Sequence, residues 1–280
     1  MTKILHIVPG TDDVANGMAA AARLIAKAQG DAQVVDLRDC SQALGCKDVE
    51  EVWVHGLWLP GEWRACWQVL RQGKRLCRMT HGSLSPVYLK RQSPLKKRLA
   101  SPIERYFLRQ ADQVVATCEK EQEWILNYER KVRQVEVVDL KRFFALGKGS
   151  ETFESQVRAG SNLHLLYMGR RHPLKGLEYL EQAVRDMDAV ELRIISNAFG
   201  DEKEKAWDWC DVLVLPTLSD NFGLVVAEAL ARGKRVVTTD GAPAWGDNED
   251  YGGRLQYLKG FVAASPANRV ALLKAALGKL

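Results

Sequence analysis

LVLPTLSDNFGLVVAEALARGKRVVTT, residues 213–239, contains a complete strand, loop, helix and strand pattern. The opening apolar run stops at Pro216, which is typical of the end of a buried strand. Apolar residues then recur at helical spacing from Leu224 to Arg232, and Gly233 ends the predicted helix. Arg235 to Thr239 is a second predicted strand. Such a unit is typical of a parallel α/β sheet, in which ligands bind at the carboxyl ends of the strands.

Two acidic residues fall at that edge of the predicted sheet, Asp220 in the loop and Glu228 on the helix. From their spacing alone, the favoured interpretation is structural, with Asp220 as a cap of the helix and Glu228 as a solvated helix residue. The surrounding SDNFGLVVAEALARGKRVVTT resembles the donor-site signature of the family 4 retaining glycosyltransferases. This resemblance implies that Asp220 contacts the transferred sugar and that Glu228 holds the ribose of the nucleotide. The first acid of the family is Glu, which is one methylene longer than Asp. Four intervening residues are also assigned to donor binding: Asn221, Phe222, Gly223 and Leu224.

Length and composition are those of an ordinary soluble protein. The chain of 280 residues allows two domains, and 46% hydrophobic with 27% charged residues is enough for a packed core. No apolar run is long enough to span a bilayer, and the first residues predict a strand rather than a signal peptide. The six cysteines are scattered, so we expect reduced core thiols and no metal site. These features predict a cytoplasmic protein, and the net charge of +5 suits an anionic ligand or surface.

The first strand, Lys3 to Val8, leads into a glycine-containing loop and an Ala-rich helix. Gly17 precedes this helix, and Asn16 is placed to cap it. Free N–H groups and the helix dipole at such a position attract phosphate, although a plain turn glycine is an equally ordinary interpretation. The family resemblance implies that Gly17 approaches the diphosphate of the donor.

HGSLSPVYLKRQSPLKKRLASPIERYFLRQADQVVAT, residues 81–117, resembles a long block of the same family. The resemblance implies that His81 lies near the reacting sugar, where it hydrogen bonds and orients the substrate. A second histidine, His55, begins the segment HGLW, which resembles members of the family that build bacterial surface glycans. For His55 we consider both a place beside the acceptor and a purely structural role.

The part of this block from Lys90 to Arg109 is strongly basic, with Glu104 as its single acid. Its apolar residues fall at helical spacing, which predicts a basic amphipathic helix. One interpretation is that the apolar stripe packs on the sheet while the charges face water. The alternative is contact with an anionic membrane, where each basic residue contributes roughly 1 kcal/mol. The apolar residues concerned are Leu95, Leu99, Ile103, Tyr106 and Phe107.

Residues 141–162 lack regularly spaced apolar residues, which predicts a linker, so we place the domain boundary near residue 150.

GRRHPLKGLEYLEQAV, residues 169–184, resembles the next segment of the family. Gly169 allows the chain to turn and is assigned to donor binding. The resemblance implies that Arg170 and Lys175 grip the diphosphate and take the place of a metal ion, because fixed cations stabilise the charge that the leaving diphosphate gains.

Taken together, the resemblance implies the GT-B fold, an α/β architecture of two Rossmann-like domains that face each other across a cleft. Residues 1–150 would form the acceptor-side domain and residues 151–280 the nucleotide-sugar-binding domain. The expected activity is retaining transfer of a sugar from a nucleotide-diphosphate-sugar to a glycan or glycolipid, in the synthesis of lipopolysaccharide or another surface glycan. We expect no cofactor, no metal and no nucleic-acid partner, and a cytoplasmic location that includes the inner face of the membrane. The alternatives are a nucleotide-sugar epimerase on the same fold and a non-catalytic relative that binds glycan or membrane.

Overall fold

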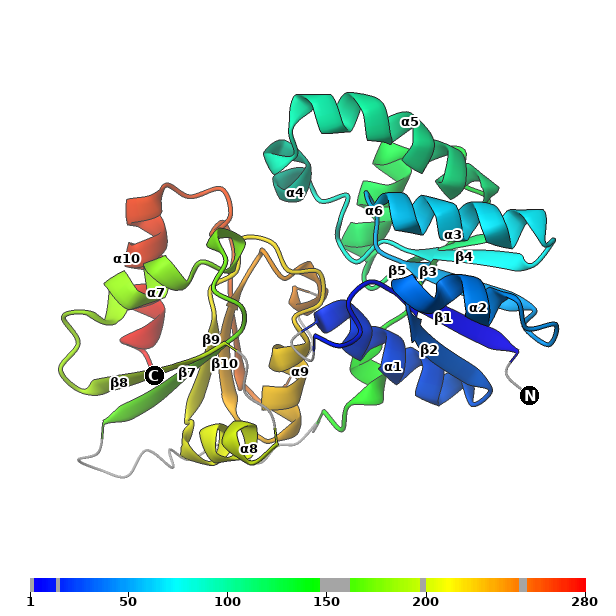
Figure 1. The fold of residues 1–280 in the computed structure, drawn as a ribbon. Helices are drawn as coiled ribbons and strands as arrows, with labels where there is room; N and C mark the ends of the chain where they lie inside the picture. The colour runs from blue at the N-terminus through cyan, green and yellow to red at the C-terminus, as the bar shows by residue number, and fades with distance from the viewer. Residues whose placement is uncertain (1–2, 14–15, 147–161, 197–199, 247–250) are drawn as a thin grey trace. The chain divides into compact units, whose positions relative to one another are not determined.

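The computed structural model describes residues 3–13, 16–146, 162–196, 200–246 and 251–280. These residues form two compact units, Met1–Leu140 and Lys141–Leu280 (Figure 1). The predicted boundary near residue 150 lies within residues 147–161, outside the described residues. No helix in the described ranges is long and apolar enough to cross a membrane.

The first unit contains a parallel sheet in the order β2-β1-β3-β4-β5-β6. Short apolar runs form the strands, and a helical segment follows most of them. The strands are β1 (Ile4–Val8), β2 (Ala32–Asp36), β3 (Glu51–His55), β4 (Arg75–Met79), β5 (Gln113–Ala116) and β6 (Val135–Val137). The α-helices are α1 (Gly17–Gln29), α2 (Cys40–Leu44), α3 (Pro60–Arg71), α4 (Pro86–Arg91), α5 (Pro94–Gln110) and α6 (Glu119–Tyr128), with the 3-10 turn η1 (Leu37–Asp39). A further 3-10 turn, η2 (Leu140–Phe143), spans the boundary between the two units.

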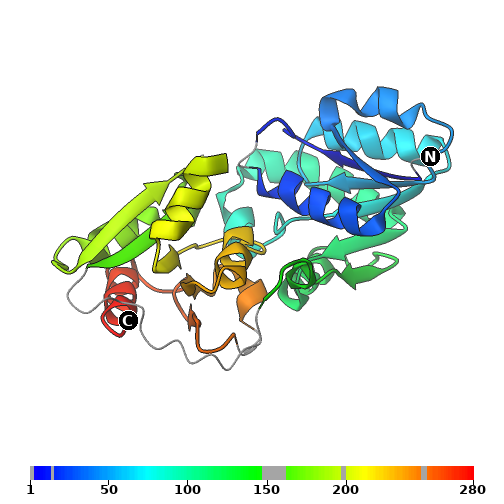
Figure 2. The ribbon, with the colours of Figure 1, turned by 90° about the horizontal axis from the view of Figure 1, so that it is seen from below.

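The two faces of this sheet are covered by different helices. Successive side chains of a strand point to opposite faces, so Ile7 and Val8 of β1 belong to different cores. Ile7 joins a large cluster that includes Cys66 of α3, whereas Val8 packs against Ala19 and Ala22 of α1. Figure 1 shows α1 and α3 on opposite faces of the sheet, and Figure 2, seen from below, shows α1 in front of the strands. His6 of β1 lies on the same face of the sheet as Val8.

The second unit contains a parallel sheet in the order β11-β10-β9-β7-β8. Its strands are β7 (Leu163–Met168), β8 (Val190–Ile195), β9 (Val212–Leu215), β10 (Arg235–Thr239) and β11 (Leu255–Leu258). Its helices are α7 (Leu177–Val184), α8 (Gly200–Trp209), α9 (Leu224–Ala231) and α10 (Pro266–Leu277), with 3-10 turns η3 (Pro173–Lys175) and η4 (Pro243–Trp245). α7 packs beside α10, and α9 lies against β9 and β10 (Figure 1).

Residues 213–239 fold as the sequence predicts, into β9, a loop, α9 and β10. β9 is fully buried in the middle of its sheet, between β10 and β7. The predicted α/β class with two parallel sheets is therefore confirmed. Since all strands of the second unit run the same way, the loops that follow β7, β9 and β10 meet at one edge of the sheet.

Candidate functional site

Three loops of the second unit are bonded together at this edge. The carbonyl oxygen of Leu174, in the loop after β7, accepts three hydrogen bonds from the loop after β9. They come from the N–H groups of Leu218 (2.8 Å) and Ser219 (3.3 Å) and from the hydroxyl group of Thr217 (3.0 Å). The third loop joins through the N–H of Asp220, which donates to the carbonyl oxygen of Gly241 (2.7 Å). Hydrogen bonds thus join the three loops into one continuous structure at this edge of the sheet.

Two glycines allow these loops to approach so closely. Gly176 has φ +64°, and a Cβ atom there would lie 2.0 Å from the carbonyl oxygen of Pro216. A Cβ atom on Gly241 would lie 2.1 Å from the carbonyl oxygen of Thr217. Neither backbone oxygen can move without disturbing the end of β9. Both positions therefore require glycine.

Lys175 and Asp220 are brought together by these contacts. The ammonium group of Lys175 forms an ion pair with the carboxylate of Asp220, and the two side chains are 18% and 22% exposed. Asp220 does not occupy the N-cap position of the following helix: Gly223 is the N-cap residue of α9. The interpretation of Asp220 as a plain helix cap is therefore wrong. Two residues from separate predicted motifs form one charged pair.

Glu228 lies on α9 and pairs with a different lysine. Its carboxylate is 2.6 Å from the ammonium group of Lys203 on α8, and the side chains are 25% and 28% exposed. Within the described residues, no contact joins Glu228 to Lys175 or Asp220. Both acids of the predicted donor motif thus carry a lysine partner from another element. Lys203 was not predicted, because it lies in a run of charged residues with no distinguishing signal.

The residues between the two acids form the start of α9 and part of the core. Phe222 is buried, its ring lies 5.2 Å from that of Trp245, and its carbonyl oxygen accepts a hydrogen bond from Nε1 of Trp245. Gly223 has φ +69°, the left-handed conformation that favours glycine. Asn221 and Leu224 are half-buried. The side chain of Phe222 therefore packs inside the unit, so a contact with donor would have to come from its backbone.

Arg170 and Gly169 form the turn after β7. The carbonyl oxygen of Arg170 accepts a hydrogen bond from the hydroxyl group of Tyr167 (3.0 Å), which fixes the turn. The guanidinium group is exposed and makes no ion pair or hydrogen bond with the described residues. Unlike Lys175, Arg170 is thus available to an anion without breaking a contact to those residues.

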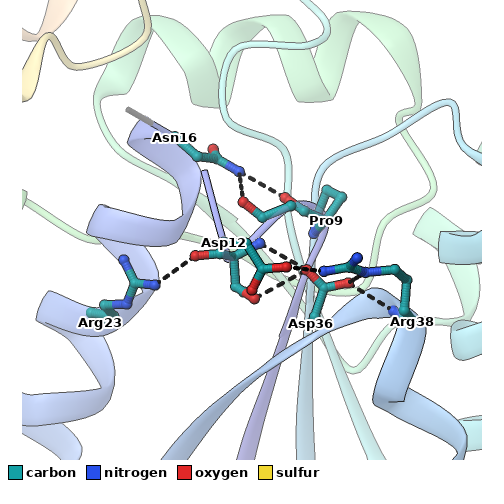
Figure 3. A network of polar contacts seen from close by, with 8 residues as sticks. Pro9, Asp12, Asn16, Arg23, Asp36 and Arg38 are labelled. Atoms are coloured by element: carbon teal, nitrogen blue, oxygen red, sulfur yellow. Dashed lines mark hydrogen bonds and ion pairs between the residues drawn. The ribbon is translucent and has the colours of Figure 1, made fainter. Parts of the chain in front are cut away.

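The loop after β1, in the first unit, is held by the carboxylate of Asp36 at the end of β2 (Figure 3). Asp36 Oδ2 accepts hydrogen bonds from the N–H (2.8 Å) and hydroxyl group (3.0 Å) of Thr11. Asp36 Oδ1 accepts from the N–H (2.9 Å) and Nε (2.8 Å) of Arg38, which also pairs with Asp12. The Arg38 contact is the main reason that the pKa of Asp36 lies well below its usual range. The described part of the loop is fixed by its own contacts.

Asn16 caps α1, as the sequence predicts. Its Oδ1 accepts from the N–H of Met18 (3.0 Å), and its Nδ2 donates to the carbonyl oxygen of Pro9 (2.7 Å; Figure 3). Next to this cap, a Cβ atom on Gly17 would meet nothing within 4 Å. Packing among the described residues therefore does not require glycine at this position. Space that no described residue fills, beside the first N–H groups of a helix, suits the predicted approach of a phosphate.

His81 follows β4 in a turn that is held by one buried carboxylate. Its φ of +49° is unusual for a residue other than glycine. Glu121 of α6 accepts hydrogen bonds from the hydroxyl group of Thr80 (2.5 Å) and the N–H of Gly82 (2.6 Å). The same carboxylate accepts from the N–H (2.7 Å) and hydroxyl group (3.0 Å) of Thr117 after β5. Glu121, which was not predicted, thus joins the ends of two strands and fixes His81.

His55 supports His81 from inside the unit. Nε2 of His81 lies 2.8 Å from Nδ1 of His55, which is fully buried. Burial is the main cause that lowers the pKa of His55 well below its usual value, and it lowers the pKa of His81 to about 3. Both rings are therefore neutral near pH 7. This geometry favours the structural role that was one of the two interpretations of His55.

The basic segment forms α4 and α5, and most of its predicted apolar stripe does not pack inward. Leu95, Leu99 and Tyr106 are 67%, 64% and 52% exposed, and Ile103 is 37% exposed. Phe107 packs inward as that interpretation requires, but the interpretation is wrong for the other four residues of the stripe, because a different side of α5 is buried. That side consists of Ala100, Glu104, Phe107 and Leu108. The exposed apolar side is unusual for a helix of a soluble domain.

The charges of α5 divide into two groups. Arg105 and Arg109 form ion pairs with Glu129, at 3.6 Å and 2.7 Å. Three cations near the start of the helix, Lys96, Lys97 and Arg98, form no ion pair within the described ranges. Unpaired cations therefore accompany the exposed apolar residues at the start of this helix.

Two family models match the chain. The model described as glycosyl transferases group 1 matches residues 150–275, and the model described as glycosyl transferase 4-like domain matches residues 21–141. The first match falls in the second unit, and the other covers most of the first unit. No curated protein matches the chain.

Several solved structures are similar over nearly the whole chain. Sucrose-phosphate synthase from Thermosynechococcus elongatus has 15% identity and a TM-score of 0.70, over 98% of this chain and 89% of that one. HepE from Anabaena, in complex with UDP-glucose, has 15% identity and a TM-score of 0.66, over 98% and 89%. Trehalose 6-phosphate synthase from Burkholderia multivorans has 12% identity and a TM-score of 0.60, over 100% and 90%. At these identities, the similarity shows a shared fold.

Proposed function

Since this chain is a glycosyltransferase of the GT-B fold, we propose that it moves a sugar from a nucleotide-diphosphate-sugar to a hydroxyl group of a glycan or glycolipid, with retention of configuration. The ion pair between Lys175 and Asp220 is the observation that supports this proposal most directly. It sets a cation beside the acid that the family resemblance assigns to the sugar. The pair lies at the sheet edge where parallel α/β proteins bind their ligands.

In the proposed reaction, the bond between C1 of the sugar and the diphosphate oxygen breaks. The leaving diphosphate gains negative charge, which Lys175 and Arg170 stabilise more in the transition state than in the ground state. The acceptor hydroxyl attacks C1 from the face that the diphosphate leaves, so the configuration is retained. The proton of the acceptor passes to the departing phosphate oxygen. Two cations at the diphosphate lead us to propose that transfer needs no metal ion.

The remaining residues bind the donor and the sugar in this proposal. Glu228 holds the hydroxyl groups of the ribose, and Asp220 accepts hydrogen bonds from the transferred sugar. In the first unit, Gly17 gives the diphosphate access to the start of α1, and His81 hydrogen bonds a hydroxyl group of the sugar. We take UDP-glucose as the first donor to test, since it is the ligand named for the similar structure of HepE.

The direct experiment is a transfer assay with a panel of nucleotide sugars, each with and without glycan and lipid-linked acceptors. Release of nucleoside diphosphate should depend on acceptor, and NMR of the product should show the anomeric configuration of the donor. The activity should survive a chelator. A change of the donor sugar without any acceptor would indicate an epimerase, and donor binding without turnover would indicate a non-catalytic relative. Inversion of the anomeric centre would contradict the retaining mechanism.

We further propose that the exposed side of α5 binds an anionic membrane surface. Leu95 and Leu99 offer apolar side chains, and Lys96, Lys97 and Arg98 offer unpaired charge beside them. An apolar side flanked by cations matches the arrangement by which helices bind the interface of anionic membranes. Such contact would bring the protein to the inner face of the cytoplasmic membrane. There it would meet a lipid-linked acceptor, which we propose to be a growing lipopolysaccharide or related surface glycan.

A further inference from the structure

Three histidines form a row across the sheet of the first unit, which we call the histidine row: His6 of β1, His55 at the end of β3, and His81 after β4. Nδ1 of His6 lies 2.9 Å from Nε2 of His55, and Nδ1 of His55 lies 2.8 Å from Nε2 of His81. The row begins at the end of α1, where the side-chain oxygen of Gln29 lies 2.7 Å from Nε2 of His6. β1, β3 and β4 are neighbours in the sheet. Four side chains from distant parts of the sequence therefore form one continuous chain of hydrogen bonds.

The inner rings of the row are closed off from water. His6 and His55 are fully buried, and the ring of Trp53 stacks on His6 with centroids 5.1 Å apart. Burial is the main cause that lowers the pKa of His6 to about 4 and the pKa of His81 to about 3, and it lowers that of His55 as well. All three rings are neutral near pH 7. A neutral imidazole has one N–H group and one lone pair, so each ring donates once and accepts once.

Neutral rings in such a row can carry their protons in only two ways. Either every ring donates toward Gln29, or every ring donates away from it, because each hydrogen bond needs one donor and one acceptor. The oxygen of Gln29 only accepts, so Nε2 of His6 must carry the proton. Nδ1 of His6 then accepts from Nε2 of His55, and Nδ1 of His55 accepts from Nε2 of His81. This arrangement leaves Nδ1 of His81 unprotonated.

We propose that Gln29, His6 and His55 are positioning residues that set the tautomer of His81, so that His81 offers an unprotonated Nδ1 to a hydroxyl group of the substrate. Nδ1 of His81 makes no hydrogen bond to a described residue, and His81 is half-buried. His81 thus accepts a hydrogen bond and does not act as a general acid. A lone pair that is fixed in advance orients a hydroxyl group without reorganisation during the reaction. The tautomer is a property of the protein alone, whereas its effect on transfer rests on the proposed function.

The tautomers can be measured by 15N NMR, which reports the nitrogen that carries the proton in each ring. The sequence has only five histidines, so the signals of His81 can be assigned by their loss in His81→Asn. His164 and His172 of the second unit serve as internal references. We expect all three rings of the histidine row to be protonated on Nε2 near pH 7.

Substitutions of Gln29 should change the tautomer of a residue that they do not touch. In Gln29→Lys, the ammonium group can only donate, so the row should reverse and His81 should carry its proton on Nδ1. In Gln29→Met, a side chain of similar size offers no acceptor, and His81 should lose its single tautomer. Gln68→Met, on α3 of the same unit, makes the same chemical change at a residue whose side chain bonds Ser41 and none of the other described residues, and it should leave His81 unchanged.

In the transfer assay, Gln29→Met and Gln29→Lys should lower kcat about tenfold with little change in the donor KM, because the lost orientation acts on the reacting sugar. The inference is overturned if His81 of the wild type carries its proton on Nδ1, or if the tautomer of His81 is the same in Gln29→Met as in the wild type. If Gln29→Lys does not fold, the tautomer of His81 in the wild type and in Gln29→Met still tests the inference. If the tautomers change as expected but the wild type transfers no sugar, the histidine row stands and the proposed function fails.

Discussion

The ammonium group of Lys175 and the carboxylate of Asp220 form an ion pair that joins the loop after β7 to the loop after β9. The carbonyl oxygen of Leu174, next to Lys175, accepts three hydrogen bonds from the second loop. The backbone contacts thus hold the two loops together, and the ion pair joins a side chain of one loop to a side chain of the other.

Substitutions of Asp220 and Glu228 should change different kinetic constants of the transfer reaction. Glu228→Gln should mainly raise the donor KM, because contacts to the ribose are made in the ground state and the transition state alike. Asp220→Ala should mainly lower kcat, because Asp220 is assigned to the sugar where charge develops. Steady-state kinetics with varied donor separates the two effects. Equal loss of kcat in both variants, with unchanged KM, would contradict the division of roles.

Asp220→Glu tests whether the site is adapted to the shorter acid. The Lys175 ion pair and the hydrogen bond from the N–H of Asp220 to Gly241 hold the carboxylate in place. One more methylene should break this fit and lower kcat. A rise in kcat would show instead that the site is poorly matched to Asp. Wild-type transfer by both Asp220→Glu and Asp220→Ala would show that the carboxylate has no role in the reaction.

Two glycine substitutions should separate packing from ligand binding. Gly176→Ala should lower the free energy of unfolding by about 1–3 kcal/mol, because a Cβ atom would overlap the carbonyl oxygen of Pro216 and φ is positive. Gly17→Ala should leave stability unchanged, since its Cβ atom would meet no described residue within 4 Å, but should weaken donor binding. Denaturant unfolding and calorimetric titration measure the two quantities. Equal donor affinity for Gly17→Ala and the wild type would remove Gly17 from the donor site.

Acidification should destabilise the protein through the histidine row. The pKa of His6 is lowered from a usual value near 6.5 to about 4, so the unfolded state takes up a proton that the folded state does not. The stability from this group is complete above pH 6.5 and is lost as pH falls toward 4. His55 and His81 act in the same direction. A tenfold change in proton affinity is worth about 1.4 kcal/mol, so the midpoint of thermal unfolding should fall clearly between pH 7 and pH 4.5.

Glu62 provides the control for this pH dependence, because its effect has the opposite sign. Burial raises the pKa of Glu62 to about 7, so the unfolded state loses its proton first as pH rises above its usual value near 4.5. Its contribution therefore favours stability at low pH. Glu62→Gln should remove this opposing effect and make the fall on acidification steeper. A midpoint that stays constant or rises from pH 7 to pH 4.5 would show that the histidines are not neutral in the folded protein.

Binding to anionic vesicles should depend on both parts of the exposed side of α5. Replacement of Lys96, Lys97 and Arg98 by Gln should weaken flotation, and so should rising salt, because screening shortens the reach of the charges. A matched variant with three exposed lysines of the second unit replaced by Gln should float like the wild type; these are Lys205, Lys259 and Lys279. Leu95→Ser with Leu99→Ser should weaken flotation without a change of charge. Equal binding to neutral and anionic vesicles would reduce this side of α5 to a solvated surface.

Local patterns in the sequence predict the fold and several positions of the site. Strand and helix periodicity places β9, α9 and β10 correctly, and the Asn16 cap follows from its position before an Ala-rich helix. Periodicity and capping depend on residues that are close together in the sequence, so they can be recognised in a single sequence. The same patterns do not show which side of α5 is buried, because apolar residues occur on both sides of this helix.

Contacts between distant segments could not be predicted in this way. The pairing of Lys203 with Glu228 depends on how α8 lies against α9, and the histidine row depends on which strands are neighbours. His6 looks like an ordinary strand residue, and Gln29 like an exposed helix end. The role of Glu121 could not be predicted from the sequence either. Its carboxylate accepts hydrogen bonds from residues after β4 and β5, and these strand ends come together only when the two strands pair.

Calorimetric titration of nucleoside diphosphates into the wild type, Lys175→Met and Arg170→Met tests the central claim most directly. At least one nucleoside diphosphate should bind the wild type, and each substitution should weaken its binding by about 10- to 100-fold, as expected for loss of a charge-assisted contact to phosphate. Arg171→Met removes an adjacent cation that pairs with Glu181 at 3.5 Å, and it should bind like the wild type. Absence of binding to any nucleoside diphosphate, or equal affinity in all four proteins, would contradict a donor diphosphate at the edge formed by the loops after β7 and β9.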